Sequence, residues 1–285
     1  SEHKVADEKW GQGTSTNFHS LMHEIGHALG LDHSFSGNDT LPTSRDFTNY
    51  TIMSYTNPSK DNYATDAWNA QEYMISTTPM VYDIAALQYL YGTAVHNGGD
   101  TVYAYDPAQP VSEAIWDSGG IDTLDFSSFA LSCDLDLAQG GYSTIAFTDW
   151  TMTDNLGISY GTTIENAIGG SGSDLIVGNG EANKLYGGTG AGVQDTLTGN
   201  GGADIFVCSL SDAVTDATVA DIISDFTNGT DLIGLEDLAW SDLTILDSGA
   251  NAKIVNTVTS KVLFVLESFD HTLIESTDFV ATDFV

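Results

Sequence analysis

The stretch HEIGHALGLDH, residues 23–33, is the most informative part of the sequence. On a helix, His23 and His27 lie one turn apart and face the same side. Both imidazoles can therefore reach one metal ion at about 2.0–2.1 Å. Gly30 lets the chain leave the helix sharply, which returns His33 to the metal as a third ligand.

Three neutral nitrogen ligands leave Zn²⁺ with a net positive charge and an open coordination position. That combination lowers the pKa of a water molecule and polarises a peptide carbonyl. Glu24 lies between the first two histidines, near enough to hold this water without being a ligand. TIMSY follows at residues 51–55, which makes Met53 the residue of a Met-turn. The full HExxHxxGxxH pattern with its Met-turn is far more specific than HExxH alone. The alternative, a helix with three surface histidines and a core methionine, explains less of the pattern.

The sequence divides into three zones. Residues 1–92 indicate mixed helix and loop, residues 93–207 are rich in Gly, Asp and Thr, and residues 208–285 alternate apolar strands with Asp-containing turns. We expect one long helix from about residue 16 to Gly30 and a second from Pro79 to Gly92. The first helix should present one broad apolar face, made of Phe18, Leu21, Met22, Ile25 and Leu29.

Composition restricts the function. The 285 residues include 40 Asp and Glu against 7 Lys and Arg, a formal net charge of -33. Nucleic acids and anionic membranes would repel such a chain. Salt adaptation, solubility or binding of divalent cations would each explain the charge. No stretch approaches the roughly 20 apolar residues of a membrane span. We expect Cys133 and Cys208 to be free thiols, although a disulfide between them stays an alternative.

A short quasi-repeat, GGSGSDLIV, GNGEANKLY, GGTGAGVQDTL and GNGGADIFV, occupies residues 169–207. The nine-residue GGxGxDxUx pattern, in which U is apolar, is typical of a parallel β-roll or β-helix. Glycine supplies turn geometry that other residues avoid, and Asp side chains with turn carbonyls are hard donors for Ca²⁺. We expect one apolar side chain of each repeat in a narrow core between two sheets, namely Leu175, Leu185, Leu197 and Ile205.

The zinc motif, the MSY turn and the Gly/Asp repeats together resemble the serralysins, metzincin proteases secreted by Gram-negative bacteria. The resemblance implies that Tyr55 also binds zinc and swings away to stabilise the oxyanion; a merely packed tyrosine is the alternative. It implies that Met53 forms an apolar floor beneath the metal. It further implies a zinc-dependent endopeptidase of broad specificity, in which Glu24 activates water and returns the proton to the leaving amine.

The resemblance also implies a fold and a set of calcium ligands. Residues 1–92 would be the zinc-binding part of an α+β metzincin C-terminal subdomain. Residues 93–285 would be an all-β parallel β-roll, or RTX domain, with a β-sandwich-like C-terminal region. The calcium ligands would be Asp117, Gly119, Gly120, Asp122, Thr163, Glu165, Gly170, Gly172, Asp174, Gly187, Gly190, Gly199, Gly201 and Asp204. Residues 98–101 could hold another ion, although an ordinary turn explains any single position.

Two departures from the repeat bear on calcium. Extra residues between Gly190 and Asp195 put a calcium contact through Asp195 in doubt. Asn183 stands where the repeat usually has Asp, which should weaken that turn. The repeat is short, so we expect few ions.

The end of the chain, TDFVATDFV, resembles the C-terminal signal that a type I secretion apparatus reads in this family; a plain terminal strand is the alternative. This route implies a secreted, extracellular protein without an N-terminal signal peptide. Because calcium is scarce inside cells, the roll would fold after export. The chain begins with Ser1 rather than Met, so we expect a processed product or a fragment.

The resemblance fails at the start of the chain. Metzincin catalytic domains have an N-terminal subdomain whose edge strand pairs with the substrate, and the residues before His23 are too few to build it. A separate chain could supply this subdomain and restore an active endopeptidase. Otherwise the chain would be a weakly active or inactive calcium-stabilised binding module, or a different zinc hydrolase. Casein hydrolysis and a denaturing gel that detects a co-purifying fragment would separate these readings.

Overall fold

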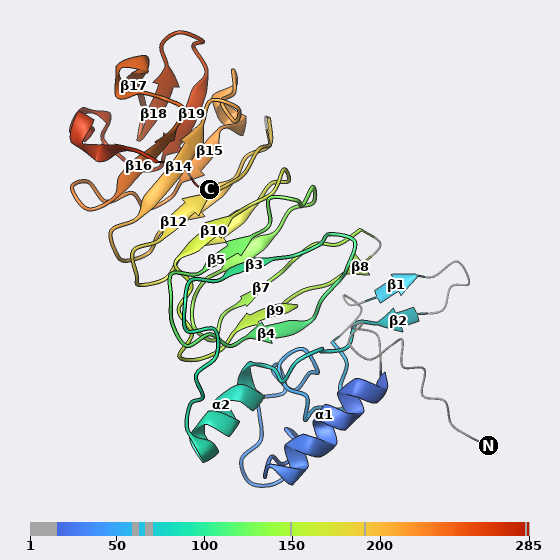
Figure 1. Ribbon diagram of the computed structural model, residues 1–285. Helices are drawn as coiled ribbons and strands as arrows, with labels where there is room; N and C mark the ends of the chain where they lie inside the picture. Colours follow the sequence, from blue (N-terminus) through green and yellow to red (C-terminus); the bar gives the residue numbers. More distant parts are fainter. Residues whose placement is uncertain are drawn as a thin grey trace. The chain divides into compact units, whose positions relative to one another are not determined.

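The computed structural model describes residues 16–58, 63–65, 71–148, 150–190, 192–282 and 284, which contain two α-helices and many short strands (Figure 1). The chain forms two compact units that alternate along the sequence. Unit 1 comprises Ser1–Gly98, Pro107–Gly119 and Gln139–Thr163. Unit 2 comprises Gly99–Asp106, Gly120–Ala138 and Ile164–Val285. Strands are therefore the main regular secondary structure of the described chain, and both α-helices belong to unit 1.

Unit 1 is organised around helices α1 (Thr16–Ala28) and α2 (Val81–Tyr91). It also has two small sheets, one of β2 (Gln71–Tyr73), β1 (Tyr63–Thr65) and β8 (Trp150–Thr151), the other of β4 (Glu113–Ile115), β9 (Leu156–Ile158) and β7 (Tyr142–Ser143). Helices and loops meet in an apolar cluster of Met22, Leu31, Ile52, Met53, Met80, Val81 and Ala114. This cluster lies beneath the predicted metal motif.

Both predicted helices are present, and α2 matches its prediction closely. It ends at Gly92, whose φ of 83° suits glycine and whose N–H bonds to Gln88 O at 2.8 Å. The predicted apolar face of α1 is only partly right. Met22 is buried, but Leu21 and Ile25 are 44% and 47% exposed, because the described part of unit 1 packs against one edge of that face.

Unit 2 contains two sheets of seven strands each. The first has the order β20-β16-β14-β12-β10-β5-β3 and the second β17-β18-β19-β15-β13-β11-β6. From β10 to β16, successive strands alternate between the two sheets and pair in parallel with the strand two positions away. The strands are β3 (Val102–Ala104), β5 (Thr123–Asp125), β6 (Asp134–Asp136), β10 (Asn166–Ile168), β11 (Leu175–Val177), β12 (Lys184–Tyr186), β13 (Thr196–Thr198), β14 (Ile205–Ser209), β15 (Asp221–Ile223), β16 (Leu232–Glu236), β17 (Leu243–Ser248), β18 (Asn251–Asn256), β19 (Val262–Leu266) and β20 (Phe279–Ala281).

The repeats form the strands as expected, and the side chains at the strand centres are fully buried. Leu185 and Leu197 take the predicted core positions. Leu175 and Ile205 do not: Leu175 is 40% exposed, and their neighbours Ile176 and Phe206 are buried instead. The reason is the two-residue period of a strand, because the register pairs Ile176 with Leu197 and Phe206 with Leu185.

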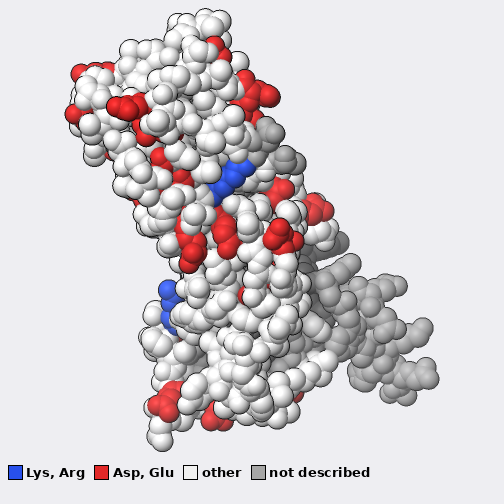
Figure 2. All heavy atoms as spheres, turned by 60° about the vertical axis from the view of Figure 1, so that its left-hand side comes forward, with Lys and Arg blue, Asp and Glu red and all other residues white. Residues whose placement is uncertain are grey.

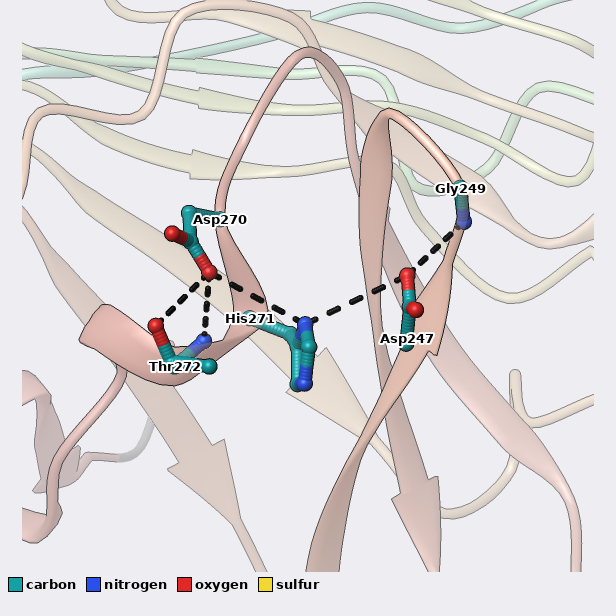
Figure 3. Close-up of polar contacts among 5 residues, drawn as sticks. All are labelled: Asp247, Gly249, Asp270, His271 and Thr272. Carbon is teal, nitrogen blue, oxygen red and sulfur yellow. Dashed lines mark hydrogen bonds and ion pairs between the residues drawn. The ribbon is translucent and has the colours of Figure 1, made fainter.

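At the C-terminal end of unit 2, strands β17, β18 and β19 pair antiparallel. His271, in the short helix η4 (His271–Leu273), lies with Nδ1 4.0 Å from Asp247 Oδ1 and 3.9 Å from Asp270 Oδ1 (Figure 3). Hydrogen bonds from the backbone N–H and then the hydroxyl of Thr272 lower the pKa of Asp270. Because these groups are largely exposed, their ion pairs add little to stability.

Acidic side chains are spread over much of the face drawn in Figure 2, with only isolated basic ones among them. Cys133 and Cys208 are both buried and are not joined by a disulfide, as predicted. No helix in the described residues is long and apolar enough to cross a bilayer. The first 15 residues, and Asp283 and Val285 of the predicted signal, lie outside the described residues.

The close approach of neighbouring turns in unit 2 predicts that Gly169→Ala is destabilising. A Cβ on Gly169 would lie 2.1 Å from the backbone oxygen of Gly187, whereas one on Gly180 would meet nothing within 4 Å. We expect Gly169→Ala to cost about 1–3 kcal/mol and Gly180→Ala to stay within about 0.5 kcal/mol of wild type. Thermal unfolding in calcium-containing buffer measures both, and equal melting temperatures would contradict the packing described.

Candidate metal centre

Helix α1 and the turn after it bring the three histidines of the motif together. The helix places His23 and His27 on one side, one turn apart. Gly30 follows with a φ of 94°, a left-handed conformation that favours glycine, and Leu31 N donates to Gly26 O at 3.0 Å across the helix end. The chain then reverses and returns His33. The ligand atoms of His23, His27 and His33 all lie within 4.8 Å of one another.

Main-chain carbonyls fix which nitrogen of two imidazoles carries the proton. His23 Nδ1 lies 2.7 Å from Ile52 O, and His27 Nδ1 lies 2.8 Å from Leu31 O. Because a carbonyl oxygen can only accept, each Nδ1 is the donor and each Nε2 keeps its lone pair. This is the arrangement in which histidine binds metals, since the bond at Nδ1 orients the ring and raises its basicity.

The Nε2 atoms of the three histidines lie close together. His27 Nε2 and His33 Nε2 are 3.0 Å apart. His23 is only 6% exposed, and its Nε2 is buried without a hydrogen-bond partner among the described residues. A buried nitrogen that lacks a partner is costly. A cation bound by three imidazole nitrogens would satisfy all of them, and this donor set fits Zn²⁺.

Tyr55 lies beside His33, and Met53 lies against the helix that carries His23 and His27. Tyr55 is 66% exposed, and its hydroxyl oxygen lies 2.7 Å from His33 Nε2. Glu24 is on the exposed side of α1. Met53 is 2% exposed and packs against the helix, because a Cβ on Gly26 would lie 2.6 Å from its sulfur. The Met-turn thus supports α1 directly beneath the histidines.

Sequence reasoning missed three residues of the site: Gly26, Thr51 and Asp83. Gly26 gives Met53 the space it occupies. Asp83 is 2% exposed and accepts hydrogen bonds from Thr51 Oγ1 at 2.6 Å, Ile52 N at 2.7 Å and Met80 N at 2.8 Å. Burial raises the pKa of Asp83 to about 6. The only available signal was an acidic residue in the first turn of a helix, a common cap position.

Several predicted calcium ligands are brought together in unit 2. Asp122 is fully buried, Thr101 N donates to its Oδ1 at 2.8 Å, and its own N donates to Glu165 Oε2 at 2.8 Å. Asp174 accepts from Gly170 N at 2.6 Å and from Cys133 N at 2.7 Å. The predicted glycines of unit 2 lie in the segments between its strands, namely Gly120, Gly170, Gly172, Gly187, Gly190, Gly199 and Gly201.

Asp117, Gly119 and Thr163 belong to unit 1. Asp117 is fully buried, and its Oδ1 accepts from Gly119 N at 2.9 Å. Its backbone N donates to Thr162 Oγ1 at 3.0 Å. This is the geometry of an Asp turn, in which a short side chain bonds to a backbone N–H two residues on.

In unit 2, acidic residues of successive turns are connected by hydrogen bonds in which the backbone N–H of one donates to the carboxylate of the next. We call such a series a ladder. Asp174 N donates to Asp195 Oδ1 at 2.8 Å, and Asp195 N to Asp221 Oδ1 at 2.9 Å. Asp204 stands in a second ladder, with Asn183 N donating to its Oδ1 at 2.8 Å. Asp195 therefore stands beside Asp174 despite the extra residues before it. Asp221 and Asp231 were not among the predicted ligands, although each is followed, two residues later, by a core isoleucine.

These ladders place carboxylates of like charge close together, where burial shields them from solvent. Burial, then the charge of Asp221, raises the pKa of Asp195 to about 8. Burial raises the pKa of Asp221 to about 7 and those of Asp174 and Asp204 to about 6. Asn183 differs, because its amide satisfies itself by accepting from Asn179 N at 2.8 Å and donating to Glu165 O at 3.0 Å. The carboxylates differ from this neutral amide because they can carry charge, and no ion pair with a basic side chain is found for them among the described residues.

Comparison with known proteins relates this chain to zinc metalloproteases. A sequence profile of the family described as Peptidase M10 serralysin C terminal matches residues 82–281, and one described as Met-zincin matches residues 19–100. Metallopeptidase AprA of Pseudomonas marginalis is 36% identical over 187 residues, covering 58% of this chain and 38% of the relative.

Serralysin of Proteus mirabilis is also 36% identical over 187 residues, covering 58% of this chain and 36% of its own length. Serralysin C of Dickeya chrysanthemi is 36% identical over 191 residues, covering 60% of this chain and 36% of its own. The chain thus spans less than two fifths of the length of these curated relatives. Since the C-terminal profile extends over most of the sequence, the chain belongs to the serralysin C-terminal family of M10 peptidases.

Proposed function

We propose that this chain carries the zinc site of a secreted, zinc-dependent endopeptidase that hydrolyses peptide bonds in proteins. His23, His27 and His33 would hold the metal, with Tyr55 as a further ligand. The observation that carries the proposal is that the ligand nitrogens of the three histidines converge. Main-chain carbonyls meanwhile accept hydrogen bonds from Nδ1 of His23 and His27. When bound, zinc would acidify water and polarise the scissile carbonyl.

The remaining chemistry falls to side chains of this chain. Glu24 is exposed beside His23, so its carboxylate can accept the proton of the attacking water and return it to the leaving amine. The exposed hydroxyl of Tyr55, 2.7 Å from His33 Nε2, can donate a hydrogen bond to the oxyanion that develops on the substrate. Met53 would hold α1 in place from below.

We further propose that unit 2 is an RTX β-roll with a β-sandwich-like C-terminal region, stabilised by calcium. In functional terms, residues 1–92 would carry zinc and residues 93–285 calcium. The parallel strands that alternate between two sheets support a roll. The raised pKa values of Asp174, Asp195 and Asp204 support cation binding, because each carboxylate lies near another acidic side chain and forms no ion pair with a basic residue in the described part of the chain. The predicted set of calcium ligands stays a proposal, to which Asp195 and Asp221 are natural additions.

The whole enzyme would include more than this chain. The match covers less than two fifths of each relative, so we propose that an upstream subdomain, in the same polypeptide or on a separate chain, binds the substrate backbone. Export through a type I apparatus would deliver the protein to calcium outside the cell. A weakly active, calcium-stabilised binding module is the alternative function. Casein hydrolysis by the purified chain, with a denaturing gel for co-purifying fragments, separates the two.

Glu24→Ala should abolish hydrolysis without removing zinc, because Glu24 acts on protons and is not a ligand. General acid–base groups of this kind typically contribute about 10²–10⁴ in rate. The measurement is casein hydrolysis together with zinc content. Glu181→Ala, which removes an exposed carboxylate from unit 2, is the matched control and should retain full activity. Near-normal hydrolysis by Glu24→Ala would contradict the proposed role.

Tyr55→Phe should lower kcat by about 10²–10³ and change KM little, since the phenol acts on the developing oxyanion. Tyr89→Phe, which alters a tyrosine that is 90% exposed on α2, serves as the control. Steady-state kinetics on a peptide substrate separate the two constants. An unchanged kcat would leave Tyr55 with a packing role only.

Without calcium, the protein should lose stability as pH rises. The pKa values of Asp174, Asp204, Asp221 and Asp195 lie at about 6, 6, 7 and 8 in the folded chain, above the ordinary value near 3.9. A raised folded pKa gives stability that is present at low pH and lost as pH rises through that pKa. The melting temperature in a calcium chelator should therefore fall between about pH 5 and pH 8.5.

Two variants and added calcium test the cause of this decline. Asp195→Asn should flatten it, whereas Asp216→Asn should not, because Asp216 is exposed and hydrogen bonds from Thr218 lower its pKa. Millimolar Ca²⁺ should raise the melting temperature most at high pH, where it replaces protons as the counter-charge. A melting temperature that is independent of both pH and calcium would refute the calcium-roll proposal.

A further inference from the structure

A single buried carboxylate holds the Met-turn. Oδ1 of Asp83 accepts from Thr51 Oγ1 at 2.6 Å, and its Oδ2 accepts from Ile52 N at 2.7 Å and from Met80 N at 2.8 Å. All three partners are donors, and an ionised carboxylate only accepts, so the match is complete in charge and direction. Asp83 thereby attaches the turn to the start of α2.

The same turn orients one metal ligand. Ile52 donates its N–H to Asp83 and accepts from His23 Nδ1 at 2.7 Å through its carbonyl oxygen. Residue 52 is thus held on one side by Asp83 and bonded on the other to the imidazole. The hydroxyl of Thr51 also accepts from Met53 N at 3.0 Å, which fixes the following residue of the turn.

We propose that Asp83 is a positioning residue for the metal centre, acting through residue 52 to set the orientation and the protonated nitrogen of His23. This inference rests on the proposed zinc site but adds a residue outside the histidine motif and on another helix. Groups that orient metal ligands from behind typically change metal affinity by 10–100-fold when they are removed.

The structure provides an internal comparison, because His27 does not depend on Asp83. The carbonyl that accepts from His27 Nδ1 belongs to Leu31, in the turn that ends its own helix. Loss of Asp83 should therefore release the ring of His23 and leave that of His27 in place. A general loosening of unit 1 would affect both rings.

The experiment compares Asp83→Asn and Thr51→Val with two controls. Thr51→Ser keeps the hydroxyl that bonds to Asp83. Asp154→Asn alters a carboxylate of the same unit whose partners are instead Tyr50 and Arg45. Competition with a chelator measures zinc affinity. We expect it to fall about 10–100-fold for Asp83→Asn, less for Thr51→Val, and to stay near wild type for both controls.

A second readout needs neither zinc nor activity. In zinc-free, ¹⁵N-labelled protein, the Nδ1–H of His23 should give a signal protected from solvent exchange. Asp83→Asn should abolish that protection and preserve that of His27. This measurement stands even if the chain hydrolyses no protein, so failure of the proposed function and failure of the positioning role are distinguishable.

The proposal is overturned if folded Asp83→Asn retains both wild-type zinc affinity and a protected His23 proton. It is equally overturned if His23 and His27 lose protection together, since that would mean general loosening. Should Asp83→Asn fail to fold, the two Thr51 variants decide: equal zinc affinity and equal His23 protection in Thr51→Val and Thr51→Ser would refute it.

Discussion

Two hydrogen bonds to main-chain carbonyls, from His23 Nδ1 to Ile52 and from His27 Nδ1 to Leu31, are the constraint on which the metal centre depends. They decide which nitrogen of each ring remains available, and α1 decides where those nitrogens point. Two other residues of unit 1 support this constraint. Gly30 turns the chain so that Leu31 can accept, and Asp83 holds residue 52 so that its carbonyl can accept.

Unit 2 depends on a different kind of interaction. Its core is narrow, with one apolar side chain at the centre of each short strand, so burial alone supplies limited stability. The ladders that contain Asp174, Asp195 and Asp221 set carboxylates against one another in a chain of net charge -33. Cations that neutralise these carboxylates would turn the strongest repulsion in the unit into a cross-link between turns.

The sequence predicted what depends on local spacing. The i and i+4 positions of His23 and His27 and the glycine before His33 were enough to bring three imidazoles together. Support from distant segments escaped prediction, because nothing in the spacing pairs Asp83 with the Met-turn 30 residues earlier. A one-residue uncertainty in strand phase placed Leu175 in the core instead of Ile176. Asp221 was missed because its turn lacks the glycines of the repeat, although it occupies the next rung of the ladder.

We propose that the Nε2 atoms of three histidines share one zinc ion. The most direct test is a crystal structure of the zinc-loaded protein with anomalous diffraction measured on both sides of the zinc absorption edge. We predict one strong anomalous peak at about 2.0–2.1 Å from Nε2 of His23, His27 and His33, with both Nδ1 bonds to carbonyls retained. A peak bound through Nδ1, or no peak at the histidines in crystals that contain zinc elsewhere, would contradict the account.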